Sequence, residues 1–169
     1  VQTCALPISY GGATTVSGGT LALTSTGTLG NTVSRLTLSS GSLDLQSRAQ
    51  TVGSLVMNGT SPAITNSTGT SSLTVTGTST LAAGTGDITL NNAANNFGGT
   101  VNASGANVTL VDGAGGLTLG NVTAGSLTAT STGGAITDAT GSTVNVSGTT
   151  TLAATNNGAP ADVTLDNAT

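Results

Sequence analysis

Two stretches of this chain have closely similar sequences, and this duplication limits what the chain can fold into. Residues 51–83 read TVGSLVMNGTSPAITNSTGTSSLTVTGTSTLAA, and residues 123–154 read TAGSLTATSTGGAITDATGSTVNVSGTTTLAA. Leu55 is equivalent to Leu127, 72 positions later (127 minus 55). A tandem repeat of this kind indicates a stacked repeat architecture. We therefore expect repeat units of about 72 residues over 35–86 and 87–161, with a third unit starting at 162–169.

Short aliphatic clusters with a spacing of two residues recur between stretches of Gly, Asn, Ser and Thr. Examples are TLAL, LTL, LDL, LTV, DITL and VTL. Such alternation predicts strands with one buried face. Each cluster is too short to form a stable sheet alone, but stacked strands find neighbours about 4.8 Å above and below. The sequence therefore predicts an all-β fold, a right-handed parallel β-helix (β-solenoid) present as an uncapped fragment, with turns of roughly 18–24 residues.

The alternation also predicts the direction of individual side chains. The inward set is Leu55, Ile64, Leu73, Val75, Leu81, Ile88, Leu90, Leu127, Ile136, Val144, Val146, Leu152, Val163 and Leu165. The outward set is Thr74, Thr89, Asn145 and Thr164. We expect the two copies to stack in register. Thr155–Ala161 replaces Gly84–Gly86 in the second copy, and it should bulge at a corner with Pro160 on the bulge.

Composition excludes several functions. Only 5% of the residues are charged, the net charge is −4, and Arg35 and Arg48 are the sole basic side chains. This pattern does not support nucleic-acid binding. The longest apolar runs are only a few residues, too short to span a membrane as a helix. We expect Arg35, Asp44 and Arg48 to be solvated surface residues, and Met57 and Phe97 to fill the core.

The chain contains no His, and its ionisable groups offer little chemistry. Two carboxylates close in space would be needed for glycosidase-like catalysis. Asp87 and Asp162 are repeat-equivalent, so a repeated turn explains their spacing more simply. Gly84–Ile88 resembles half of a calcium-repeat motif, but the copy at Ala159–Val163 lacks both glycines. We therefore predict no catalytic residue, no cofactor site, no metal site and no enzymatic activity.

Seven Asn-x-Ser/Thr motifs are possible modification sites. Their asparagines are Asn58, Asn66, Asn102, Asn107, Asn121, Asn145 and Asn167. A chain rich in Asn, Ser and Thr produces such motifs by chance, so modification stays an open alternative.

Val1–Ile8 differs in composition from the Thr- and Gly-rich rest of the chain and resembles a translated sequencing adapter. We therefore exclude residues 1–8 from the fold, give Cys4 no role, and treat residues 9–169 as a single β-solenoid.

Two segments carry a resemblance to known families. Tyr10–Gly30 contains Ala13-Thr14-Thr15-Val16 followed by Gly18-Gly19-Thr20-Leu21-Ala22-Leu23, which resembles the autotransporter-associated β-strand repeat. Asp87–Asp138 is similar to the repeats of filamentous-haemagglutinin-like exoproteins and autotransporter adhesins. The resemblance implies a passenger region of a Gram-negative bacterium, secreted through an outer-membrane translocator pore to the cell surface or the medium.

The resulting functional hypothesis is a structural stalk of an adhesin, which carries a binding tip toward a receptor on a host cell, matrix or bacterium. Lack of cysteine in the body of the chain suits secretion, since no disulfide can form in the periplasm. A β-helical carbohydrate-active enzyme or carbohydrate-binding module is one alternative. The stalk of a contact-dependent toxin-delivery protein is another.

Overall fold

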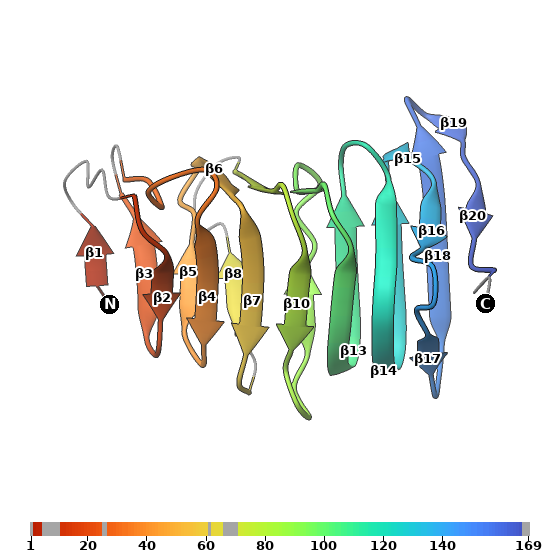
Figure 1. Cartoon of the computed structure of the whole chain (residues 1–169), viewed down its shortest axis with the longest axis horizontal. Helices are drawn as coiled ribbons and strands as arrows, with labels where there is room; N and C mark the ends of the chain where they lie inside the picture. The colour runs from red at the N-terminus through yellow and green to blue at the C-terminus, as the bar shows by residue number, and fades with distance from the viewer. Residues whose placement is uncertain (1, 5–10, 25–26, 61, 66–70, 167–169) are drawn as a thin grey trace.

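The computed structural model is an elongated β-solenoid whose long axis runs from the N-terminal to the C-terminal end (Figure 1). It describes residues 2–4, 11–24, 27–60, 62–65 and 71–166. The described residues contain no helix. Their strands are β1 (Gln2–Cys4), β2 (Thr14–Val16), β3 (Thr20–Leu23), β4 (Arg35–Ser39), β5 (Ser42–Asp44), β6 (Ala49–Val52), β7 (Ser54–Asn58), β8 (Ala63–Thr65), β9 (Ser72–Val75), β10 (Ser79–Ala82), β11 (Ile88–Leu90), β12 (Asn96–Phe97), β13 (Val101–Asp112), β14 (Leu117–Ser131), β15 (Gly133–Gly134), β16 (Ile136–Asp138), β17 (Val144–Val146), β18 (Thr150–Asn156), β19 (Ala159–Pro160) and β20 (Val163–Thr164).

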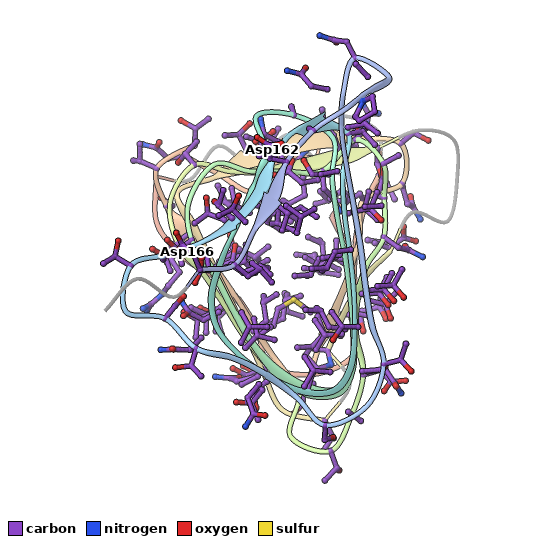
Figure 2. All side chains as sticks on the ribbon, turned by 90° about the vertical axis from the view of Figure 1, so that its right-hand side faces the viewer. Asp162 and Asp166 are labelled. Atoms are coloured by element: carbon purple, nitrogen blue, oxygen red, sulfur yellow. The ribbon has the colours of Figure 1, made fainter. Side chains whose placement is uncertain are left out.

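Each turn of the solenoid passes over three faces, and the view along the axis shows a three-sided outline filled with side chains (Figure 2). The first face stacks β2, β4, β7, β10, the start of β13, the middle of β14, and β17. The second face carries β1, β3, β5, β8, β11, the end of β13, the end of β14, and β18. The third face carries β6, β9, β12, the start of β14, β16 and β20.

Strand partners on the first face confirm the predicted turn length. Leu36 pairs with Leu55, Leu55 with Ser79, and Ser79 with Val101, which gives turns of 19, 24 and 22 residues (55 minus 36, 79 minus 55, 101 minus 79). All of these pairs are parallel. The all-β solenoid predicted from the sequence is therefore correct.

The core is one continuous cluster of inward-pointing aliphatic side chains. Most of the predicted inward set is buried: Leu55, Leu73, Val75, Leu81, Ile88, Leu90, Leu127 and Ile136. Others are partly buried and pack against that cluster: Ile64, Val144, Val146, Leu152 and Leu165. Met57 and Phe97 are core residues, as predicted. Of the predicted outward set, Thr89, Asn145 and Thr164 are exposed and Thr74 is partly exposed.

Two side chains contradict the predicted pattern. Val163 is 43% exposed because β20 pairs with β16 on one side, and no further described strand covers its other side. Asp44, expected on the surface, is only 8% exposed, and its Oδ1 accepts a hydrogen bond from the Gln46 N–H at 3.1 Å. Arg35 is exposed and Arg48 is partly exposed.

The prediction that the two copies stack in register is wrong. Leu55 lies on the first face between Leu36 and Ser79, whereas Leu127 lies on the second face beside Val108. Likewise Ile64 is on the second face and Ile136 is on the third. Leu55 pairs with Ser79, Ser79 with Val101, and Val101 with Leu119. Three turns after Leu55 the chain is therefore back on the first face, where the register shifts between Leu119 and Val122. The 72-residue repeat is therefore three turns plus one face long.

The insertion at Thr155–Ala161 leaves the parallel stack at a corner, as predicted, and there it forms an ordered hairpin. Parallel pairing of β18 ends at Ala154, opposite Ser131, and β18 then pairs antiparallel with β19. The connecting residues Asn157 and Gly158 both have positive φ, 49° and 81°, as a two-residue hairpin loop requires. The extra residues thus leave the parallel stack at a corner, and β19 stands near the upper right edge in Figure 1.

Pro160 lies on this hairpin, as predicted, opposite Thr155. Ladder hydrogen bonds alternate along an antiparallel pair. The Ala161 N–H donates to the Ala154 carbonyl at 3.1 Å, so Ala154 and Ala161 form a hydrogen-bonded pair. The next pair, Thr155 and Pro160, is therefore a non-hydrogen-bonded pair, in which no backbone N–H is required. The missing N–H of proline costs no ladder bond there.

The backbone of Gln2–Cys4 pairs in parallel with Leu21–Leu23 of β3. The remaining residues of the segment 1–8, like Asn66 and Asn167, lie outside the described part of the chain. The adapter origin of residues 1–8 stays a prediction.

Candidate functional site

Polar side chains at the corner between the first and second faces bond from one turn to the next. The Asp87 Oδ1 accepts hydrogen bonds from the Asn107 backbone N–H at 3.0 Å and from its Nδ2 at 2.8 Å. The Asn107 Oδ1 in turn accepts a hydrogen bond from the Ser126 hydroxyl at 2.7 Å. The three residues therefore form a ladder that ties three turns together. This explains Asp87 as a structural acceptor.

A second ladder occupies the corner between the third and first faces. The Asn102 Oδ1 accepts from the Asn121 N–H at 2.9 Å, and the Asn121 Oδ1 accepts from the Thr143 N–H at 3.0 Å. Side-chain amides thus supply acceptors to backbone donors at positions where the strands separate. From the sequence alone, Asn102 and Asn121 are predicted only as possible modification sites.

The described aspartates form no metal centre. Among the residues that the structure describes, no group of three or more His, Cys, Asp or Glu side chains could hold a metal ion. Gly86 donates to the Ala83 carbonyl at 2.8 Å, so the calcium-like segment closes a turn. Asp162 and Asp166 lie on the last turn, at the end nearest the viewer in Figure 2. Asp87 lies three turns and one face before Asp162 along the solenoid, so this repeat-equivalent pair is not brought together.

Asp112 is a buried ionisable residue that the sequence analysis did not single out. Its side chain is 0% exposed, and its Oδ1 accepts the Ala114 N–H at 3.0 Å. The Oδ2 has no hydrogen-bond partner, and neither has the Oγ of Ser131, which is paired with Asp112 on the next turn. Burial raises the pKa of Asp112 to about 6, against the opposing effect of backbone hydrogen bonds from Ala114 and Phe97. Asp112 lies two residues after Leu110 and four after Val108 on the same strand, so all three side chains point inward. This spacing of two is the sequence signal that could have identified Asp112 as buried.

A shallow groove of about 290 Å³ follows the corner between the first and second faces. Its lining is Gly84, Ser104, Gly105, Thr123, Ala124, Gly125, Asn145 and Ser147. Close stacking requires glycine at two of these positions, because a Cβ on Gly125 would lie 2.6 Å from the Ala106 carbonyl oxygen and a Cβ on Gly105 would lie 2.9 Å from that of Gly86. The groove is lined by small, uncharged side chains and follows from the stacking of the turns.

The structure sorts the described modification motifs into two groups. The side chains of Asn102, Asn107 and Asn121 are held in the corner ladders. Asn58 and Asn145 are exposed and have no such ladder bond. Attachment of a sugar to the second group would therefore not break a contact between turns.

No helix in the described residues could cross a membrane. Comparison with protein families gives two matches, over residues 30–104 and 105–169, to a family described as repeats of unknown function (DUF5649). The chain belongs to this family. No curated protein and no solved structure matches it.

The two DUF5649 repeats begin on different faces of the solenoid. The first starts at residue 30, shortly before β4 on the first face. The second starts at residue 105, shortly before the part of β13 that pairs with β11 on the second face. The family boundaries thus show the same displacement by one face as the equivalent leucines Leu55 and Leu127.

Proposed function

We propose that this chain is a segment of an elongated stalk in a secreted or surface-exposed bacterial adhesin. The observation that carries the proposal is the single uninterrupted core, which extends from Val16 in β2 to Ile136 in β16. One core shared by every turn makes a rod that cannot bend at a domain boundary. Such a rod would hold a binding tip at a fixed distance from the cell.

The polar ladders support the same role. Asp87, Asn107 and Ser126 connect successive turns through side chains, in addition to the backbone hydrogen bonds between strands. A protease needs a locally unfolded segment, and turns that are bonded on both sides open rarely. The proposal assigns the chain no catalytic role.

The proposal includes a secretion route. The chain would cross the outer membrane through a translocator pore in an extended state and would wind into turns outside. The low proportion of charged residues, 5%, fits this route.

The test is a replacement experiment in the bacterium that produces the protein. Deleting the segment in frame should shorten the stalk and reduce attachment of cells to their target surface. An unrelated β-solenoid with the same number of turns should restore attachment. Antibodies against the segment should bind intact cells. Restoration by the native sequence alone would contradict the proposal and would favour a ligand-binding surface on these turns, as would hydrolysis of a polysaccharide by the purified chain.

A further inference from the structure

Equivalent contacts recur in the two copies on different corners of the solenoid. In the first copy, Thr76 N–H and Oγ1 both approach the Val52 carbonyl, at 3.0 and 3.4 Å, where the third face meets the first. In the second copy, Ser147 N–H and Oγ approach the Ala124 carbonyl at 3.0 and 3.5 Å, where the first face meets the second. The same local geometry has therefore moved by one corner.

The stacked glycines give the same result independently. A Cβ on Gly77 would lie 2.6 Å from the Gly53 carbonyl oxygen, and a Cβ on Gly148 would lie 2.6 Å from that of Gly125. Gly77 and Gly148 are sequence equivalents, 71 positions apart (148 minus 77). The first pair follows the third face, and the second pair follows the first face. Each contact thus belongs to the repeat sequence and not to a particular face.

We infer that a rod built from these repeats presents the equivalent surface of each successive repeat on the next of its three faces. One repeat advances the chain by three turns and one face. Three repeats therefore advance it by ten turns, about 48 Å at roughly 4.8 Å per turn, before the same surface returns to the same side. This inference rests on the rod-like role proposed above and concerns how partners reach the rod.

The kind of partner that fits such a display is compact and binds one repeat at a time. The equivalent outward positions carry hydroxyl or amide groups, such as Thr74 and Asn145 or Thr89 and Thr164. A partner that recognises them would use uncharged hydrogen bonds. Neighbouring partners would approach from different sides without colliding. A flat or filamentous partner would meet the same groups along one side only once in ten turns.

The test compares two pairs of biotinylated cysteines in the purified chain, after Cys4→Ser removes the native thiol. Thr89→Cys with Thr164→Cys labels equivalent positions of the two copies. Thr89→Cys with Thr151→Cys is the matched control, because Thr89, Thr109, Thr128 and Thr151 form one column over three turns of the second face. The three labelled positions, Thr89, Thr151 and Thr164, are all exposed.

Streptavidin, much wider than the ~14 Å spanned by three turns, serves as the compact partner. We expect two streptavidins per chain for the Thr89–Thr164 pair and one for the Thr89–Thr151 pair, measured by native mass spectrometry. Spin labels at the same positions should show stronger dipolar broadening for the Thr89–Thr151 pair. One streptavidin and equal broadening for both pairs would overturn the inference. The readout needs no adhesion, so its failure is distinguishable from failure of the attachment experiment.

Discussion

The middle of the solenoid and its last turn carry the same sequence pattern but bury it to different extents. Ile88 in β11 is 0% exposed, whereas its equivalent Val163 in β20 is 43% exposed. β11 contacts β8 on one side and pairs with β13 on the other, while β20 pairs with β16 alone among the described strands. Alternation thus decides which way a side chain points, but neighbouring turns decide how much of it is buried.

The prediction with the largest expected effect places an aspartate at a core position in the middle of the solenoid and at the equivalent kind of position on the last turn. Leu127→Asp puts a carboxylate at a position that is 1% exposed, with no cation nearby, and should lower the free energy of unfolding by about 4 kcal/mol or more. Val163→Asp should cost about 1 kcal/mol or less, because water reaches the side chain. Urea titration followed by circular dichroism measures both. Equal losses would contradict the comparison.

A glycine between stacked turns should be less replaceable than one beside open space. A Cβ at Gly99 would lie 2.6 Å from backbone atoms of Gly77, whereas a Cβ at Gly18 would contact nothing within 4 Å. We expect Gly99→Ala to destabilise the chain by about 2 kcal/mol and Gly18→Ala to change stability by about 0.5 kcal/mol or less. Thermal unfolding of both variants would decide this. Similar melting temperatures would show that the turns separate easily.

Asp112 makes the buried middle sensitive to pH. Its folded-state pKa of about 6 lies above the ordinary value of 3.8, so the native state binds more protons than the unfolded state between these values. The free energy of unfolding should therefore fall as the pH rises from about 4 to about 6. Asp112→Asn should remove this slope and stabilise the chain at pH 7 by about 1–3 kcal/mol.

Denaturant unfolding at pH 4.5 and pH 7 checks this expectation, with the exposed Asp166→Asn as the control. A slope that persists in Asp112→Asn would assign the pH dependence to another group.

The smallest expected effect is on the outer surface of the middle turns. Thr128 is exposed although it is adjacent to the buried Leu127. Thr128→Asp should change the free energy of unfolding by about 0.5 kcal/mol or less. A loss comparable to that of Leu127→Asp would mean that this strand faces the other way.

Sequence alone was sufficient for the strands and for their inward residues, because a period of two is a local property. Leu36, Leu38, Leu43 and Leu45 are all 0–1% exposed, as their spacing predicts. The register between copies was not predictable in the same way. It depends on how many residues each corner takes up, and turns of 19 to 24 residues contain strands of similar length.

The candidate polar positions were predicted less well for a related reason. Asn107 and Asp87 are 20 positions apart, and only the turn length brings them together. Asp44 was misplaced because alternation does not show that a side chain can fold back onto its own turn, as its bond to the Gln46 N–H does.

The hairpin at Thr155–Ala161 shows that sequence length and rod length can vary separately. Seven residues there replace the three residues Gly84–Gly86, yet parallel pairing is intact up to Ala154 and resumes at Val163, which pairs with Ile136. Residues added between Asn157 and Gly158 would extend a loop that points away from the axis. This corner is thus a point at which a foreign peptide or a small domain could be inserted, leaving the height and the core of the solenoid as they are.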